Sequence, residues 1–267
     1  MRHDEGTNIP ELRRGQYRLM LNFRARSRCL WLELMPLFKR TLSEFLFRRF
    51  VLKHYGSNLL VDLQLDAKRD TLEYVKANMA DAPYFEKHPK LVRYAVEAAS
   101  LPGLYLEFGV GRGKSIRWIG THADRTVHGF DSFDGIPEYW NGNPVGAFAQ
   151  KQLPKVPDNV KFEIGMFDAT IGPFLEQNSD PISLLHVDCD LYSSTVTILD
   201  ALGSRLQPGA IVLFDEYYNF PRWQQHEYKA FQEFVERNGV EYEYIAYSVT
   251  GQQVAARILK NPIFSAG

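Results

Sequence analysis

Residues 104–115, LYLEFGVGRGKS, constrain the fold of this chain more than any other segment. The first five are apolar or aromatic apart from Glu107, which is typical of a strand covered on both faces. Gly109, Gly111 and Gly113 then allow a sharp turn and a close approach of the backbone to a ligand. A helix that starts after such a turn directs free N–H groups at an anionic group. The segment therefore predicts a strand, a ligand-binding turn and a helix.

Two other glycine-rich loops fit this segment less well. A dinucleotide-binding fingerprint needs G-x-G-x-x-G, and Lys114 stands where its third glycine belongs. A Walker phosphate loop needs G-x-x-x-x-G-K-[ST], and Phe108 occupies its leading position. A flexible turn without a ligand is the structural alternative. Glu107 favours S-adenosylmethionine, because that molecule carries an ammonium group as well as a carboxylate.

Strand-like and helix-like segments alternate along the rest of the chain. The expected parallel strands are residues 104–108, 126–131, 160–164, 182–188 and 210–215, and two further strands joined by a turn are expected at 242–247 and 254–259. Helices are expected at 70–78, 89–99, 195–202 and 226–237. This alternation predicts an α/β fold with a doubly wound, mostly parallel, Rossmann-like sheet of seven strands, including one antiparallel edge strand.

The N-terminal part differs from the rest in charge. Residues 1–53 hold twelve Lys and Arg against five Asp and Glu, although the whole chain has a net charge of −1. We expect residues 1–80 to form a basic helical extension and residues 81–267 to form the main domain. Thr41-Leu42-Ser43-Glu44 fits a capping box before an amphipathic helix. We expect the extension to pack on the acidic domain or to form a homo-oligomer through its helices. The alternative is that it contacts an anionic membrane surface or an acidic partner.

Bulk features point to a cytoplasmic enzyme. The two cysteines, Cys29 and Cys189, follow no metal spacing and are expected to be buried free thiols. The apolar run at 29–38 is too short to span a bilayer and contains a glutamate and a proline. The N-terminus lacks the pattern of a cleavable signal. A chain of 267 residues is long enough for one α/β domain with an extension.

Acidic residues end four of the five expected parallel strands: Glu107, Asp131, Asp188 and Asp215. Ligands of open α/β sheets bind beyond the carboxyl ends of the strands, so we expect these acids to share one rim. Asp188 and Asp190 would meet Asp215 and Glu216 on adjacent strand ends. Crowded carboxylates repel unless they are protonated, solvated or bound to a cation, and oxygen ligands favour Mg²⁺. Hydrogen-bonded acids that cap nearby loops are the alternative.

Two further places along the rim suit a nucleoside. Asp131 lies where an acid accepts hydrogen bonds from ribose hydroxyls, although it is equally able to cap the turn at 132–135. Met166 and Phe167 follow the third strand and would flank an adenine ring, or else belong to the core.

In these motifs the chain resembles the macrocin O-methyltransferase family, class I enzymes that use S-adenosylmethionine to methylate sugar hydroxyls. The resemblance covers about residues 104–259. It rests on EFGVG at 107–111, GFDSFDGIP at 129–137, HVDCDLYSST at 186–195, and PGA at 208–210 before DEY at 215–217.

The resemblance implies that Glu107 and the glycines hold the methionine end of S-adenosylmethionine and that Asp131 holds the ribose. The full set of expected binding residues is Glu107, Phe108, Gly109, Gly111, Gly113, Ser115, Asp131, Ser132, Met166, Phe167 and Asp188. It also implies that Asp188, Asp215 and Glu216 are ligands of a divalent metal, and their oxygen donors favour Mg²⁺. Glu216 departs from the commoner Asp-Asp-Tyr pattern.

The expected reaction is O-methylation of a sugar or glycosylated metabolite in natural-product or polysaccharide biosynthesis. The candidate general base is His226, and Asp188 is the competing base; such a group contributes about 10²–10⁴-fold to the rate. A lone histidine at a helix start is more often a surface or capping residue. Tyr139, Trp140 and Trp223 would form an apolar platform for the sugar, or else pack a lid at 137–148.

Three alternatives to this interpretation remain at the level of sequence. The first is a nicotinamide-dependent dehydrogenase, which the missing third glycine disfavours. The second is a partner- or membrane-docking protein that keeps an inactive methyltransferase fold. The third is nucleic-acid methylation, which we disfavour because clustered acids repel phosphates. We therefore expect a small-molecule or glycan acceptor and no nucleic acid.

Overall fold

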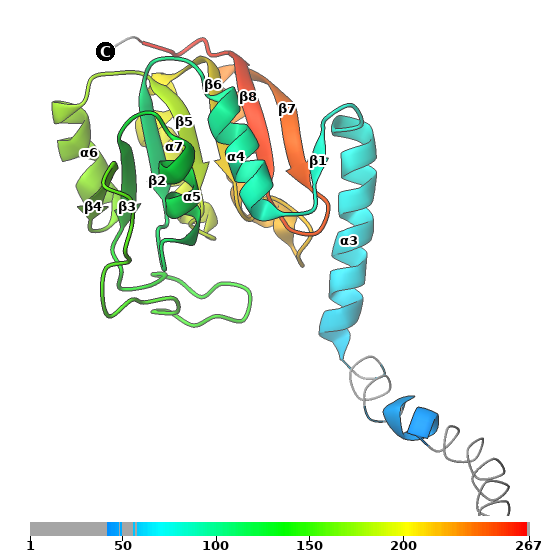
Figure 1. Cartoon of the computed structure of the whole chain (residues 1–267). Coiled ribbons are helices and arrows are strands. Elements are labelled where there is room, and N and C mark those ends of the chain that lie inside the picture. The colour runs from blue at the N-terminus through cyan, green and yellow to red at the C-terminus, as the bar shows by residue number, and fades with distance from the viewer. Residues whose placement is uncertain (1–41, 48, 50–55, 57, 266–267) are drawn as a thin grey trace, which may run out of the picture. The chain divides into compact units, whose positions relative to one another are not determined.

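The computed structural model describes residues 42–47, 49, 56 and 58–265 (Figure 1). Residues 63–267 form one compact unit, which contains every strand that the structure describes, and residues 1–62 belong to a separate unit. Residues 42–46 are helical, as expected. Thr41, Cys29 and the apolar run at 29–38 lie outside the described residues. None of the described helices has the length and apolar character that a bilayer crossing needs.

The elements follow one another in the alternating order that the sequence predicts. They are α3 (Leu59–Asn78), β1 (Tyr84–Phe85), α4 (His88–Ala98), β2 (Leu104–Phe108), α5 (Lys114–His122), β3 (Val127–Asp131), β4 (Val160–Ile164), α6 (Phe167–Gln177), β5 (Ile182–Val187), α7 (Tyr192–Leu202), β6 (Leu206–Phe214), α8 (Glu227–Asn238), β7 (Glu241–Ser248) and β8 (Val254–Lys260). Short 3₁₀ helices precede β6 (Gly203–Arg205) and α8 (Trp223–Gln225).

The strands form one sheet in the order β1-β7-β8-β6-β5-β2-β3-β4. Every pairing is parallel except the two that β8 makes, with β6 and with β7. The expected α/β, doubly wound, mostly parallel sheet is therefore confirmed. The chain leaves β2 toward β3 and β4 in one direction, then returns to β5 and continues toward β6 in the other. The topological switch point thus lies between β2 and β5.

Two details of the expected sheet were wrong. The sheet has eight strands rather than seven, because Tyr84 and Phe85 pair with the outer side of β7. The antiparallel strand is internal rather than at an edge, because the hairpin places β8 between β6 and β7. The burial of the two strands gives the reason: residues 254–256 are buried on both faces, whereas exposed and half-buried residues alternate in the first half of β7.

Helices cover both faces of the sheet. The apolar side chains of α4 and α5 pack against one face, where Leu91, Val92 and Ile116 are fully buried. These two helices lie in front of the sheet in Figure 1. The opposite face carries α6, α7 and α8, with Phe174, Ile198 and Phe231 in its core. The result is a three-layer α/β/α arrangement that buries the central strands on both sides.

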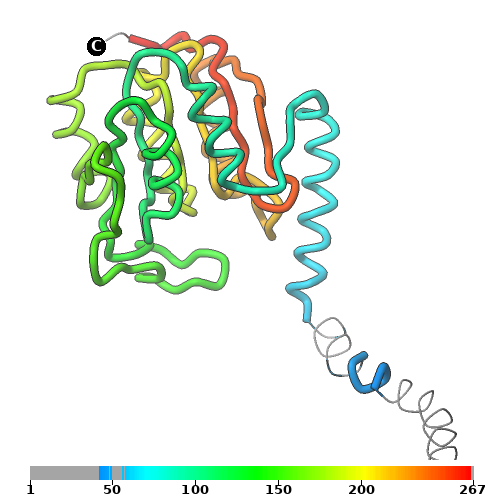
Figure 2. Tube along the Cα trace, in the orientation of Figure 1, coloured from blue at the N-terminus to red at the C-terminus, as the bar shows by residue number. Residues whose placement is uncertain are grey.

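The carboxyl ends of the parallel strands open toward one long connection. The segment between β3 and β4, residues 132–159, extends beyond these ends, as the green trace at the bottom of Figure 2 shows. It includes the expected lid at 137–148, which contains the bridge between Trp140 and Asn143. This is the edge of the sheet at which the sequence predicts ligand binding.

Tyrosine hydroxyls join the C-terminal part of α3 to the sheet. The Tyr244 hydroxyl lies 2.5 Å from the hydroxyls of both Tyr74 and Tyr217, and 3.1 Å from that of Tyr242. Gln232 Nε2 donates to the Tyr217 and Tyr242 hydroxyls at 3.0 Å. Each hydroxyl therefore depends on its neighbours for a partner, and Tyr244 stands at the centre of the cluster.

The substitution Tyr244→Phe tests this cluster. It removes the central hydroxyl that Tyr74, Tyr217 and Tyr242 share, although Gln232 still serves Tyr217 and Tyr242. We therefore expect the free energy of unfolding to fall by about 1–3 kcal/mol. Urea denaturation measures the change. The matched control is Tyr84→Phe, because the Tyr84 side chain is 63% exposed. Equal small effects of the two substitutions would contradict a stabilising role for the cluster.

Candidate active site

The backbones of β2 and β5 are in direct contact just beyond their carboxyl ends. The backbone N–H of Asp188 donates to the Phe108 carbonyl at 2.8 Å. Gly109 follows with φ +93°, and a Cβ built there would lie 1.6 Å from the Asp188 carbonyl oxygen. Only glycine fits this position, for its conformation and for the space it occupies. Gly111, at φ +48°, faces open space instead, since nothing lies within 4 Å of its added Cβ.

Asp131 holds the glycine turn in place. One of its carboxylate oxygens accepts hydrogen bonds from the backbone N–H groups of Val110 and Gly111, at 2.8 and 2.7 Å. The other accepts from the N–H of Phe133 at 2.7 Å. The expected capping of the 132–135 turn is thus present. Sequence analysis missed the bonds to the turn, because 20 residues separate Gly111 from Asp131.

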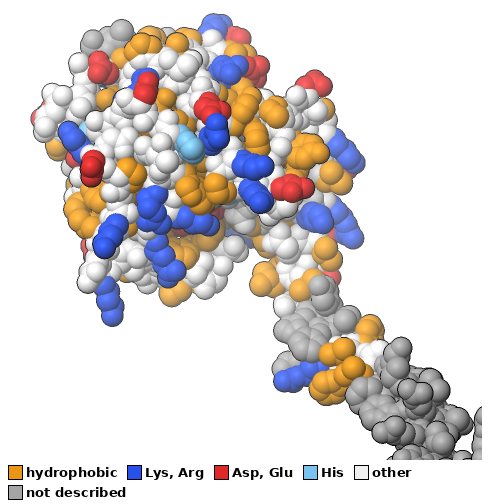
Figure 3. Space-filling model, in the orientation of Figure 1, with side chains coloured by type: hydrophobic (Ala, Val, Ile, Leu, Met, Phe, Trp, Pro, Cys, Tyr) orange, Lys and Arg blue, Asp and Glu red, His pale blue; other side chains and the backbone are white. Residues whose placement is uncertain are grey.

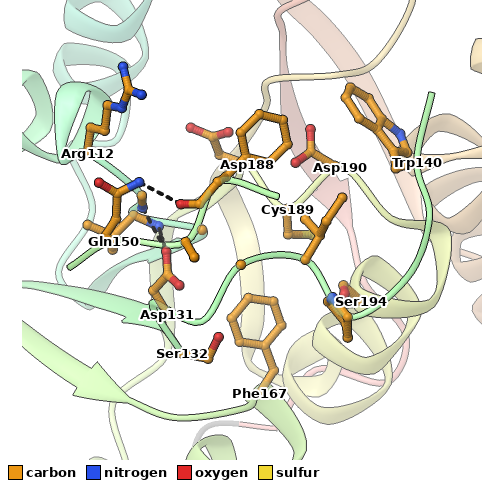
Figure 4. A pocket seen from close by; sticks show the side chains of 18 of the residues that line it. Arg112, Asp131, Ser132, Trp140, Gln150, Phe167, Asp188, Cys189, Asp190 and Ser194 are labelled. Carbon is orange, nitrogen blue, oxygen red and sulfur yellow. Dashed lines mark hydrogen bonds between the residues drawn. The ribbon is translucent and has the colours of Figure 1, made fainter. Parts of the chain in front are cut away.

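A cavity of about 670 Å³ lies between this turn, the lid segment and the ends of the strands. Nine of the residues that the sequence predicts for the site line it: Gly109, Gly111, Ser115, Asp131, Ser132, Met166, Phe167, Asp188 and Glu216. Figure 4 shows Asp131 and Ser132 on one side of the cavity and Asp190 and Trp140 on the other. Of the four strand-end acids expected to share one rim, Asp131 and Asp188 line this cavity.

The other predicted site residues do not line the cavity: Glu107, Phe108, Gly113, Asp215 and His226. Phe108 is fully buried, with its ring stacked on Phe130 at 4.4 Å between centroids. Gly113 is the left-handed residue before α5, at φ +69°, and packs against Pro154. Both therefore support the loop from behind.

Glu107 belongs to a buried polar network directly behind the cavity. Its side chain is fully buried, and burial raises its pKa. The Ser115 hydroxyl donates to Glu107 Oε1 at 3.0 Å and also lies 3.2 Å from Asp188 Oδ2. The other carboxylate oxygen, Oε2, lies 3.0 Å from Nδ1 of His186. Glu107 thus reaches the cavity through Ser115 rather than directly.

His226 packs among aromatic rings at the start of α8. Its ring centroid lies 5.5 Å from that of Phe220 and 6.3 Å from that of Trp140. Burial, followed by the charge of Arg222, lowers its pKa. Of the three expected platform residues, Trp140 lines the cavity, Tyr139 is exposed, and Trp223 is buried against Tyr74 and Tyr228.

Several cavity residues escaped the sequence analysis as ligand contacts, among them Arg112, Lys114, Gln150, Cys189 and Ser194. Most reach the cavity from loops whose path no local pattern reveals. Cys189 is buried and free, as expected. Glu227 was also missed: it is fully buried, and its Oε2 accepts from the backbone N–H of Glu216 at 3.1 Å. An acid in the first turn of α8 was the available signal.

Carboxylates converge at the floor of the site. Asp188, Asp215 and Glu216 each present one oxygen, and these atoms lie within 4.8 Å of one another. Burial, together with the negative charge of Asp215, raises the pKa of both Asp188 and Glu216 well above the usual range. The same two causes raise the pKa of Asp190 to about 7. Asp215 Oδ1 and Glu216 Oε2 are buried and have no hydrogen-bond partner. These donors fit a hard divalent cation.

The outer surface does not reveal this concentration of acids. On the face shown in Figure 3, acidic and basic side chains are interspersed over the upper part of the compact unit, and Lys and Arg predominate toward its lower edge. Arg112 and Lys114 are exposed residues of the cavity lining, at the entry to α5.

Comparison with known proteins agrees with this site. Residues 106–217 match the family model of a methyltransferase domain. Over 220 residues the chain is 28% identical to the 8-demethyl-8-(2,3-dimethoxy-alpha-L-rhamnosyl)-tetracenomycin-C 4'-O-methyltransferase of Streptomyces olivaceus, covering 72% of this chain and 80% of that one. It is 26% identical over 216 residues to the mycinamicin III 3''-O-methyltransferase of Micromonospora griseorubida, covering 68% and 82%. The solved structure of the O-methyltransferase NovP shares the fold, with a TM-score of 0.51, 23% identity, and coverage of 64% and 79%.

The glycine turn at the switch point, the acids at the strand ends and the matched domain identify a class I S-adenosylmethionine-dependent methyltransferase. The two curated relatives named above are O-methyltransferases. The relatives are consistent with the resemblance to the macrocin family. The matched domain is that of a methyltransferase, so the dehydrogenase alternative has no support.

Two glycine substitutions separate the structural and ligand-binding roles of the turn. Gly109→Ala places Cβ against the Asp188 carbonyl, so we expect a loss of more than about 3 kcal/mol of stability. Gly111→Ala meets no neighbour and costs about 1–2 kcal/mol for its left-handed backbone. We expect it to remain folded but to bind S-adenosylhomocysteine at least about tenfold more weakly. Urea denaturation and titration calorimetry measure the two effects. Unchanged binding by Gly111→Ala would show that the ligand does not approach the turn.

Proposed function

We propose that this enzyme methylates a hydroxyl group of a sugar or glycosylated metabolite, with Mg²⁺ at the carboxylate floor of the cavity. The observation that carries the proposal is the convergence of Asp188, Asp215 and Glu216 beside a cavity that is large enough for a nucleoside and an acceptor. Both relatives named above are O-methyltransferases, and the printed name of the first includes a rhamnosyl group, which supports a sugar acceptor here.

The cosubstrate would lie along the rim from the glycine turn to the third strand. Gly109, Gly111 and Ser115 would hold its methionine end, with Glu107 fixing Ser115 from behind. Asp131 and Ser132 would meet the ribose, since the Asp131 carboxylate has lone pairs beyond the three that the backbone uses. Met166 and Phe167 line the cavity where the adenine ring would follow.

Asp188, Asp215 and Glu216 would hold the metal ion. When bound, Mg²⁺ lowers the pKa of a coordinated hydroxyl and orients it. In the transfer, the acceptor oxygen bonds to the methyl carbon, and the bond from that carbon to sulfur breaks with its electron pair staying on sulfur. The hydroxyl proton passes to a base. Asp188 lines the cavity, which suits a general base better than His226, whose side chain lies outside the lining.

Trp140 offers one face of the acceptor site. It lines the cavity and is 8% exposed, and its indole N–H is buried without a hydrogen-bond partner. An apolar ring with a free donor fits a sugar, which presents C–H faces and hydroxyl acceptors. Ile136 and Phe148 of the same connection line the cavity beside it.

Three single substitutions distinguish the metal from the base. Glu216→Gln weakens a metal ligand only, so turnover falls but recovers at high Mg²⁺. Asp188→Asn removes a ligand and the base, so kcat falls by about 10²–10⁴-fold and extra Mg²⁺ does not restore it. His226→Ala leaves kcat within about tenfold of the parent. Methyl transfer to an acceptor panel, measured over a Mg²⁺ titration, provides the readout.

The exposed Asp134→Asn serves as the matched control for loss of one acid. Binding of S-adenosylhomocysteine, followed by calorimetry, shows whether each variant keeps its cosubstrate site. If His226→Ala lost activity as severely as Asp188→Asn, His226 would be the base. Activity that no Mg²⁺ concentration changes would remove the metal from the proposal.

A pair of tryptophan substitutions tests the acceptor site. Trp140→Phe keeps an aromatic ring but loses the N–H donor, so we expect the KM for the acceptor to rise by about 5–30-fold with the affinity for S-adenosylhomocysteine unchanged. Trp223→Phe is the control, because its indole N–H is likewise buried and unpartnered but its ring packs between Tyr74 and Tyr228. Steady-state kinetics measure both. A KM that responds equally to the two changes would argue against a sugar at Trp140.

A further inference from the structure

We propose that His88, His186 and Asp215 form a second cation site, behind the carboxylate floor, for a first-row transition-metal ion such as Zn²⁺. His88 is the first residue of α4, His186 lies in β5, and Asp215 directly follows β6. The Nε2, Nδ1 or carboxylate atoms that these side chains offer lie within 4.8 Å of one another. This site differs from the group of Asp188, Asp215 and Glu216 because two of its three ligands are histidine nitrogens. The two groups have Asp215 in common.

Three buried atoms in this group lack a partner. They are Nε2 of His88, Nε2 of His186 and Oδ1 of Asp215. His88 Nε2 lies 3.0 Å from Asp215 Oδ1, but the pair does not have the geometry of a hydrogen bond. The His186 side chain has no exposed surface at all. Buried polar atoms without partners are rare in folded proteins, and a shared partner at the centre of the group would satisfy all three.

Glu107 prepares His186 for this role. Its Oε2 lies 3.0 Å from Nδ1 of His186, and neither side chain has any exposed surface. A carboxylate at that distance fixes the tautomer with the proton on Nδ1, which leaves the lone pair on Nε2. Carboxylates orient metal-binding histidines in the same way in known metal sites. Ser115 occupies the other oxygen of Glu107, so the orientation is held from both ends.

The ligand types determine the class of ion. Two imidazoles and a carboxylate suit Zn²⁺ and its neighbours in the first transition row, whereas Mg²⁺ prefers oxygen ligands. Three protein ligands leave one position of a four-coordinate ion for water. Ligand atoms around such an ion lie roughly 3.3 Å apart. The His88 and Asp215 atoms, 3.0 Å apart, are already near this spacing, and all the ligand atoms lie within 4.8 Å of one another. A bound ion would also offset the charge of the adjacent buried acids and fix Asp215 for its place beside Asp188 and Glu216.

Metal analysis of the full chain tests the proposal. The protein is stripped with a chelator, loaded with Zn²⁺ or Co²⁺ in excess Mg²⁺, and freed of loose ions by gel filtration. We expect elemental mass spectrometry to find one tightly held ion per chain. The Co²⁺-loaded protein should show a visible absorption spectrum typical of mixed nitrogen and oxygen ligands. His88→Ala should weaken binding by at least about tenfold. His88 is the best position for the test, because its side chain is 19% exposed and tolerates truncation better than His186.

Two controls locate the ion. His122→Ala removes an exposed histidine at the end of α5 and should leave binding unchanged. Glu216→Gln should weaken Mg²⁺ but not Zn²⁺. Circular dichroism verifies that each variant is folded. Failure to retain an ion would overturn the proposal. Retention that His88→Ala does not affect would place the ion elsewhere, including on His3, His54 or Cys29 outside the described residues, and would equally overturn the proposal. Neither result bears on the acceptor of methyl transfer.

Discussion

The backbone contact between Gly109 and Asp188 is the constraint on which the rest of the site depends. It joins the ends of β2 and β5 where the sheet reverses its winding, with no room for a side chain between them. The turn that follows then lies against the strand that carries Asp188, and Asp131 secures it from the next strand. The glycine turn and the carboxylate floor are adjacent because these two backbones touch.

This arrangement concentrates negative charge in a poorly solvated place. Glu107 and Glu227 are fully buried, and Asp188, Asp190, Asp215 and Glu216 are partly buried around them. Carboxylates in such surroundings are stable only when they are protonated, hydrogen-bonded or paired with a cation. The protein supplies hydrogen bonds to Glu107 and to Glu227. The atoms left without partners, on Asp215 and Glu216 above all, lie where a cation fits.

Much of the fold and part of the site were predictable from local pattern. Apolar runs revealed all seven of the longer strands, and alternation with helices indicated the doubly wound sheet. The place of β8 was not predictable, since it depends on which of two hairpin strands is buried on both faces. Helix α3 begins eleven residues before its expected start at Asp70. The added residues 59–69 are exposed apart from Val61 and Ala67, so no buried apolar face marks them in the sequence. The glycine-rich motif led us to expect Phe108 and Gly113 at the ligand. In the structure they lie outside the cavity lining and support the turn from behind.

The sequence by itself determined the chemistry that is available: glycines that permit the turn, and acids that end neighbouring parallel strands. Both follow from short-range rules, since backbone freedom and strand direction are properties of contiguous residues. Only the tertiary structure decided which side chains face the cavity and which face each other. Glu107 contacts His186 instead of the cavity, and Asp131 accepts a hydrogen bond from the glycine turn. His88, at the start of α4, lies beside Asp215, which follows β6. Those pairings join residues up to 127 positions apart, and their partners are chosen by packing, which no local pattern records.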